Sequence, residues 1–148
     1  MSFEDAVVYQ IYPRSFRDST GDGVGDLRGI VEKVPYIASL GVDYVWLNPF
    51  FPSPGCDNGY DVSDYCAVDP AMGSLEDFDD LVAALGAHGI GVMLDMVLNH
   101  TSTEHEWFQR ALAGEQRYRD YYYIRPAREE GSPPTELPTN WVSKFGGP

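Results

Sequence analysis

A short apolar run that ends in polar residues, Gly91–His100, constrains most strongly how this chain can fold. Its first half, Gly91–Leu94, follows a glycine-rich turn and has the continuous apolar character of a strand buried on both faces in a parallel sheet. Asp95, Asn99 and His100 follow it. In α/β folds, ligands bind beyond the carboxyl ends of the strands, so these residues are candidates for a binding site. The alternative is that Asp95 and His100 are hydrogen-bonded groups that hold a loop.

Two β-prone segments precede this run, Val7–Ile11 and Tyr44–Leu47, and an amphipathic segment follows each of them. The first amphipathic segment, Leu27–Leu40, has apolar residues at spacings of three and four, which predicts a helix with one buried face. That face consists of Leu27, Ile30, Val31, Val34, Ile37 and Leu40. Pro35 is expected to kink or divide the helix, because a mid-helix proline costs about 3 kcal/mol. Gly41 is the expected C′ residue.

The second amphipathic segment begins after Ser74, which is followed three positions later by Asp77. This pair predicts reciprocal capping at the start of a helix. The expected buried stripe consists of Leu75, Phe78, Val82 and Leu85. The order strand, helix, strand, helix, strand then implies a parallel sheet with right-handed crossover connections.

The segment Asp18–Asp26 alternates oxygen-bearing side chains with glycines. Three carboxylates this close repel one another unless a cation or solvent screens them. Alternating oxygen ligands with one backbone carbonyl resemble the first half of a calcium loop, although the glutamate that ends an EF-hand loop is missing. The alternative is an aspartate–glycine turn in which Asp26 caps the following helix.

A second polar segment, Asp57–Tyr65, follows a proline-rich loop after the second strand. It contains Tyr60 among several carboxylates, including Asp57. Aromatic rings beside carboxylates suit a sugar, because a ring packs against C–H faces and a carboxylate accepts hydrogen bonds from hydroxyl groups. The alternative is a polar loop with one tyrosine in the core.

The charge of the chain limits its partners. The net charge is −13, from 23 acidic and 10 basic residues, which argues against nucleic acid because phosphate binding needs clustered Lys and Arg. No apolar run approaches the roughly 20 residues of a membrane span, and the acidic N-terminus lacks an export signal. We therefore expect a cytoplasmic protein that acts on a neutral sugar, with Cys56 and Cys66 as free thiols.

The character of the chain changes after His100. A short helix is expected over Glu104–Leu112, and a tyrosine cluster, Tyr118 with Tyr121–Tyr123, is interpreted as core packing. Residues 126–138 are rich in proline and glycine, which predicts a solvated loop.

Five segments resemble the α-amylase superfamily of glycoside hydrolases (family 13) and cover nearly the whole chain in order. The spacing Asp-x-x-x-Asn-His after a buried strand is similar to the family's first signature region. The segments are Val8–Phe16, Asp18–Asp26, Asp57–Asp61, Asp95–Ser102 and Asn140–Gly147. The most similar branch contains oligo-1,6-glucosidases and trehalose-6-phosphate hydrolases, and Asn99–Thr103 and Pro138–Gly147 favour the second group.

This resemblance implies a fold and an activity. The fold is α/β: residues 1–100 correspond to the N-terminal β-α-β-α-β portion of a (β/α)8 barrel, and residues 101–148 begin the domain inserted after strand three. A complete barrel needs roughly 250 residues, so the remainder is expected in the same or another chain. The implied activity is retaining hydrolysis of α-glucosidic bonds in small sugars, either isomalto-oligosaccharides or trehalose-6-phosphate.

The resemblance also implies roles for individual residues. The glucose ring is bound by Asp57, Tyr60 and His100, and Asp95 supports that pocket. A structural calcium or magnesium ion is held by Asp18, Thr20, Asp22, the carbonyl of Val24, and Asp26. Thr20 replaces the asparagine usual in oligo-1,6-glucosidases, which weakens one ligand.

The catalytic carboxylates are expected elsewhere. In this family the nucleophile, the acid and the third carboxylate follow strands four, five and seven of the barrel, and retaining chemistry needs the first two of them. The nucleophile and the acid are therefore expected beyond Pro148, and no catalytic residue is expected within this chain.

Two other interpretations stay open from the sequence. A non-catalytic amylase-like domain, such as those attached to amino-acid transporters, needs a membrane anchor and loses sugar-pocket residues, whereas this sequence lacks an anchor and keeps the pocket. A doubly wound nucleotide-binding module has a glycine-rich phosphate loop directly after its first strand. Here the glycines alternate with aspartates, which repel phosphate.

Overall fold

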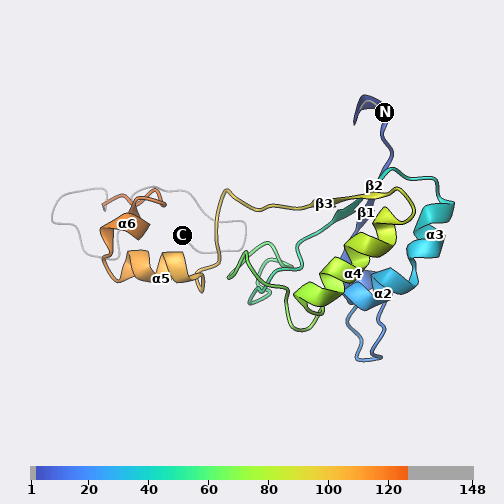
Figure 1. Cartoon of the computed structure of the whole chain (residues 1–148). Helices are drawn as coiled ribbons and strands as arrows, with labels where there is room; N and C mark the ends of the chain where they lie inside the picture. The colour runs from blue at the N-terminus through green and yellow to red at the C-terminus, as the bar shows by residue number, and fades with distance from the viewer. Residues whose placement is uncertain (1–2, 127–148) are drawn as a thin grey trace. The chain divides into compact units, whose positions relative to one another are not determined.

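A three-stranded parallel sheet forms the centre of the first compact unit of the chain in this computed structural model, which describes residues 3–126 (Figure 1). The strands are β1 (Val8–Ile11), β2 (Tyr44–Leu47) and β3 (Gly91–Leu94), in the spatial order β1-β2-β3. They pair without offset, so Ile11, Leu47 and Leu94 lie side by side. The carboxyl ends of all three strands therefore meet at one edge, and the predicted strand–helix order is confirmed.

The helices between the strands follow the local signals of the sequence. Two short helices, α2 (Leu27–Glu32) and α3 (Val34–Ser39), connect β1 to β2, and Pro35 lies in the first turn of α3. The predicted division at this proline is confirmed, because the first turn of a helix does not need the missing N–H group. Gly41 has a φ of +71° at the C′ position. Leu40 is exposed, contrary to the expectation that it belongs to the buried face.

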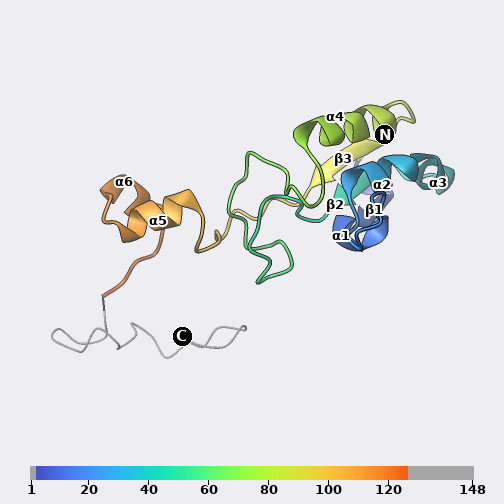
Figure 2. The ribbon, with the colours of Figure 1, turned by 90° about the horizontal axis from the view of Figure 1, so that it is seen from below.

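One apolar core fills the space between the sheet and these helices. Helices α2 and α4 (Leu75–Gly86) pack against each other over the sheet (Figure 2). The fully buried members of this core are Ile11, Leu27, Ile30, Ile37, Val45, Leu47, Leu81 and Leu85. Alternate residues of β2 enter it, as the two-residue period of a strand requires.

The capping prediction for α4 is confirmed, and the prediction of its buried face is wrong in part. Ser74 and Asp77 exchange the two hydrogen bonds of a capping box. Leu81 and Leu85 are fully buried, whereas Leu75 and Val82 are 57% and 40% exposed. The predicted Leu85 is therefore buried and Phe78 packs against the core, but Leu81 takes the buried position expected for Val82. Neighbouring residues differ by 100° around a helix, so Val82 faces away from the core.

The prediction that β3 is buried on both faces is also wrong. No residue of Gly91–Leu94 is fully buried, and Leu94 is 38% exposed. The reason is its position, since within residues 3–126 β3 pairs with β2 on one side only. Apolar content predicts the strand, but the exposure of a strand depends on how many neighbours cover it.

The second compact unit comprises residues 109–148, and α5 (Glu106–Leu112) crosses the boundary between the units. Its other described helix is α6 (Gln116–Arg119), where Tyr118 is buried beneath the Arg110 guanidinium, 4.2 Å from the ring centre. Tyr121 and Tyr123 are exposed, so the tyrosine cluster is not core packing throughout.

The predictions for the C-terminal segment lie outside the described residues. They are the solvated loop after residue 126, the family segment Asn140–Gly147, and the position of Pro148 ahead of the catalytic carboxylates. The assignment of residues 101–148 to an inserted domain stays a prediction.

Two short helical turns flank β1, namely η1 (Phe3–Asp5) and α1 (Pro13–Phe16). Among the helices of the described part, none is long and apolar enough to cross a membrane. Cys56 and Cys66 are free and exposed, as expected.

Candidate functional site

A chain of side-chain hydrogen bonds connects the ends of the three strands. Gln10 in β1 donates from Nε2 to Asn48 Oδ1 at 2.8 Å, and Asn48 Nδ2 donates to the Tyr60 hydroxyl at 2.8 Å. The Tyr60 hydroxyl donates to Asp95 Oδ2 at 3.0 Å. Asn48 and Asp95 each follow the last residue of a strand, so the flat end of the sheet places these groups in one row.

Tyr60 reaches this row because a tight turn precedes it. The amide of Tyr60 donates to the Asp57 carbonyl at 2.9 Å, which closes the turn over Asn58 and Gly59. Both central residues have positive φ, 53° and 99°. A Cβ atom at Gly59 would lie 3.2 Å from the Pro49 carbonyl oxygen, so this position suits glycine in conformation and in space.

Asp61 fixes the other side of the same loop. Its carboxylate accepts hydrogen bonds from the Ser53 hydroxyl, the Cys56 amide and the Asp57 amide. Burial raises the pKa of this carboxyl, but the Ser53 and backbone hydrogen bonds outweigh burial and hold the pKa below its ordinary value. Asp61 is therefore an ionised anchor that orients the backbone of Asp57.

His100 and the segment before it are held by two tyrosines. His100 Nε2 lies 3.1 Å from the carbonyl oxygen of Tyr60 and donates to it in the Nε2-protonated tautomer. The Tyr65 hydroxyl donates to the Val97 carbonyl at 2.5 Å and lies 2.9 Å from the carbonyl of His100. A hydrogen bond thus connects the exposed His100 ring to the loop that contains Tyr60.

The electrostatics of the row favour a neutral tyrosine. Burial raises the pKa of Tyr60, and the hydrogen bond to Asp95 and the charges of Asp95 and Asp57 raise it further. The hydroxyl therefore keeps its proton and donates a hydrogen bond to Asp95. None of the residues in the described range donates a hydrogen bond to the Asp57 carboxylate, so both of its oxygens can accept from a ligand.

The structure thus connects Tyr60, Asp95 and His100 directly and places Asp57 close enough to act on Tyr60 through its charge. Sequence analysis missed Gln10 and Asn48. A signal was present, because each is a polar residue within or directly after an apolar strand.

The Asp18–Asp26 loop uses its carboxylates differently. Asp18 accepts hydrogen bonds from the amides of Thr20, Gly21 and Gly23 and from the Thr20 hydroxyl. The backbone hydrogen bonds from Gly23 and Gly21 lower the pKa of Asp18. Asp22 accepts from the Val24 amide at 2.8 Å. The loop is therefore a hydrogen-bonded turn.

Asp26 is the N-cap of α2. Its two oxygens accept from the Ser19 amide and hydroxyl and from the Gly29 amide, the last at 2.6 Å. The oxygen chemistry of this loop suits a hard divalent cation. The side chains are not arranged as a metal-coordinating group: among residues 3–126 no three His, Cys, Asp or Glu side chains converge as metal ligands.

Comparison with known proteins assigns the family. Residues 10–148 match the family model described as the α-amylase catalytic domain. The chain is 53% identical to trehalose-6-phosphate hydrolase of Escherichia coli over 145 residues, which are 98% of this chain and 25% of that protein. It is 47% identical to oligo-1,6-glucosidase of Bacillus cereus over 146 residues, again 98% and 25%.

A solved structure agrees with these sequences. The crystal structure of Bacillus licheniformis trehalose-6-phosphate hydrolase matches with a TM-score of 0.86 and 51% identity, covering 96% of this chain and 25% of that one. The chain belongs to the α-amylase family of glycoside hydrolases, whose catalytic domain is a (β/α)8 barrel. It spans about a quarter of the length of these relatives.

Proposed function

We propose that this chain forms the glucose-binding part of an α-glucosidase-type glycoside hydrolase. The observation that supports this most directly is the Asp57 carboxylate. It has no hydrogen-bond donor in the described part of the chain, and it lies near the Tyr60 hydroxyl that donates to Asp95. A site that combines open acceptors with a half-buried aromatic ring suits a sugar, whose hydroxyl groups donate and whose C–H face packs on a ring.

Each residue has a separate role in this proposal. Asp57 and His100 bind hydroxyl groups of the glucose ring, and Tyr60 packs against it. Asp95 holds the Tyr60 hydroxyl and supports the pocket.

The catalytic carboxylates are a separate part of the proposal. Retaining glycosidases use a nucleophile and an acid–base carboxylate, and by family resemblance both follow later strands, beyond Pro148. We expect residues 1–148 alone to show no turnover of a chromogenic α-glucoside, because binding without these groups holds only the ground state. Turnover by the isolated chain would place the catalytic carboxylates within it.

Replacement of His100 tests the assignment in the full-length protein. His100→Ala should lower kcat/KM for an α-glucoside. The loss should correspond to about 2–4 kcal/mol of transition-state stabilisation, because the lost hydrogen bonds strengthen in the transition state. His88→Ala is the matched control, since His88 is an exposed histidine on the turn after α4. Equal kinetics of both variants would place the sugar site elsewhere.

The proposal for the substrate names two candidates. Relatives named trehalose-6-phosphate hydrolase are 53% and 51% identical, and a relative named oligo-1,6-glucosidase is 47% identical. We therefore propose trehalose-6-phosphate or an isomalto-oligosaccharide as substrate. Comparison of kcat/KM for trehalose-6-phosphate and isomaltose decides between them. The cytoplasmic location stays a prediction.

A structural calcium or magnesium ion is a further part of the proposal. Asp18, Thr20, Asp22, the Val24 carbonyl and Asp26 supply the oxygen ligands that these ions prefer. If the ion binds, chelation should lower the melting temperature of the full-length protein, and Asp22→Ala should remove that effect. A melting temperature that chelator leaves unchanged would show that the loop is a turn only.

A further inference from the structure

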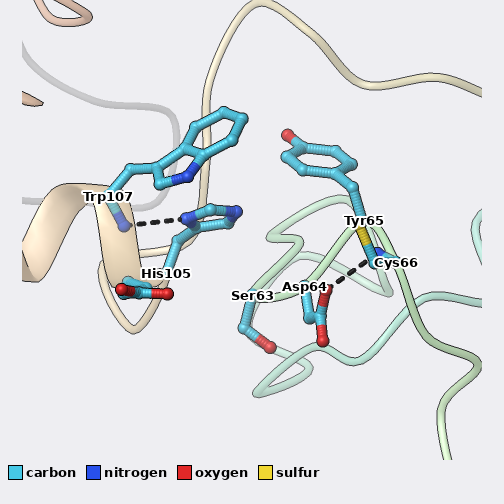
Figure 3. A pocket seen from close by; sticks show the side chains of 7 residues that line it. Ser63, Asp64, Tyr65, Cys66, His105 and Trp107 are labelled. Carbon is cyan, nitrogen blue, oxygen red and sulfur yellow. Dashed lines mark hydrogen bonds between the residues drawn. The ribbon is translucent and has the colours of Figure 1, made fainter.

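A second cavity lies beside the 63–66 segment and the start of α5, within the first compact unit (Figure 3). Its volume is about 260 Å³. Ser63, Asp64, Tyr65 and Cys66 line it on one side, and His105 and Trp107 line it on the other. Glu106 also lines it. None of the four proposed glucose-site residues lines this cavity.

His105 provides the feature that indicates a ligand. The residue is 5% exposed, and its Nδ1 accepts a hydrogen bond from the Trp107 amide at 3.1 Å. Burial lowers the pKa of His105 despite the nearby charges of Asp64 and Glu106, so the imidazole is neutral. Because Nδ1 accepts, the proton lies on Nε2, which points into the cavity (Figure 3). No residue within the described range pairs with Nε2.

Hydrogen-bond acceptors and aromatic rings complete the lining. Asp64 uses Oδ1 to accept from the Cys66 amide at 2.8 Å, and its other oxygen has no donor among residues 3–126. The Tyr65 ring, which also lines the cavity, packs against His105 at a centroid distance of 5.4 Å. Trp107 is 41% exposed and packs on His105 at 4.6 Å.

These groups exclude two classes of ligand. The Asp64 carboxylate repels an anion, and no Lys or Arg among the described residues lines the cavity. An ammonium ion suits carboxylates and aromatic rings, but it offers no acceptor to the Nε2–H donor of His105. A neutral polyhydroxy compound both donates and accepts, and its C–H groups pack on aromatic rings.

We propose that this cavity is a second binding site for a neutral polyhydroxy ligand the size of one sugar ring. The ligand accepts a hydrogen bond from His105 Nε2 and donates one to Asp64. The size follows from the volume, since pockets for drug-sized ligands hold about 300–1,000 Å³, and about 260 Å³ is smaller.

The two cysteines allow the two sites to be observed separately. Cys66 lines the second cavity, and Cys56 is next to Asp57 at the proposed glucose site; both are exposed. In the full-length protein, iodoacetamide alkylation of each thiol is followed by mass spectrometry with and without methyl α-D-glucopyranoside. A ligand in the second cavity should slow alkylation of Cys66 several-fold at saturation.

Three variants make the assignment specific. Asp64→Asn removes the open carboxylate, and His105→Asn keeps an acceptor for the Trp107 amide while removing the Nε2 donor. Each should abolish the protection of Cys66. Asp69→Asn is the matched control, because Asp69 also accepts from an amide two residues later, that of Ala71 at 2.9 Å, and does not line the cavity. It should retain full protection.

Four outcomes overturn the proposal. They are unchanged Cys66 alkylation in the presence of the glucoside, protection that survives both variants, protection lost equally in Asp69→Asn, and equal protection by tetramethylammonium or phosphate. Slowing at Cys56 without slowing at Cys66 overturns the second site and leaves the proposed glucose site intact.

Discussion

The aspartates of the Asp18–Asp26 loop and those of the proposed glucose site, Asp57 and Asp95, differ in how many hydrogen bonds they accept. In the loop, Asp18 and Asp26 each accept hydrogen bonds from several nearby amides and hydroxyls. At the proposed glucose site, the Asp57 carboxylate accepts none from the described residues, and Asp95 accepts one, from Tyr60.

This difference separates structural carboxylates from candidate binding carboxylates. A carboxylate whose oxygens accept local amides stabilises a backbone conformation. A carboxylate that keeps open acceptors beside a neutral donor can bind a ligand. Both segments are rich in aspartate and glycine, so residue content alone does not distinguish them.

Removal of Asp57 should have the largest effect on this comparison. Asp57→Ala should lower kcat/KM of the full-length enzyme by an amount that corresponds to about 2–4 kcal/mol of transition-state stabilisation. The free energy of unfolding should change by less than about 0.5 kcal/mol, since the carboxylate accepts no hydrogen bond from the described residues. Steady-state kinetics and urea denaturation measure the two effects. Loss of stability without loss of activity would reverse the assignment.

Gly29 tests whether the acidic loop is a rigid part of the fold. A Cβ atom at Gly29 would lie 2.0 Å from the Arg17 carbonyl oxygen, which is backbone and cannot move aside alone. Gly29→Ala should therefore destabilise the protein by about 3 kcal/mol. Gly86→Ala is the control, because a Cβ atom in that helical position meets nothing within 4 Å. It should be neutral or stabilise by up to about 1 kcal/mol.

Asp26 tests the capping role of the loop. Asp26→Ala should lower the free energy of unfolding by about 1–2 kcal/mol, because the Ser19 and Gly29 amides lose their acceptor. Asp26→Asn should lower it less, since one oxygen remains. Catalysis should change little in either variant once the protein is folded. A decrease in kcat/KM as large as that of Asp57→Ala would show that Asp26 does not have a purely structural role.

The smallest expected effect is the dependence of stability on pH. Burial raises the pKa of Asp26 and Asp61, but their hydrogen bonds from Ser19 and Ser53 and from backbone amides lower both pKa values below the ordinary value of 3.8. A lowered folded-state pKa stabilises the protein above 3.8, and this stabilisation is lost as the pH falls through the folded-state pKa. Urea denaturation between pH 6 and pH 2 should show this loss, and Asp26→Asn and Asp61→Asn should each reduce it. An unchanged slope in both variants would contradict the assignment.

Features that depend on neighbouring residues along the chain could be predicted from the amino-acid sequence. Ser74 and Asp77 predict a capping box, and Pro35 predicts the division between α2 and α3. These features arise from hydrogen bonds and backbone conformations within a few residues. The resemblance to the α-amylase family could also be stated from the sequence, and the family match confirms it.

Three other properties follow from the packing of distant segments: the buried face of α4, the exposure of β3, and which described carboxylates accept no hydrogen bond. The packing also places Gln10 and Asn48 in the hydrogen-bonded row with Tyr60, and it buries His105 against the Tyr65 ring. These properties depend on partners that are tens of residues apart. Burial and hydrogen-bond saturation are determined by which surfaces meet, and that is fixed only when the strands and helices have packed.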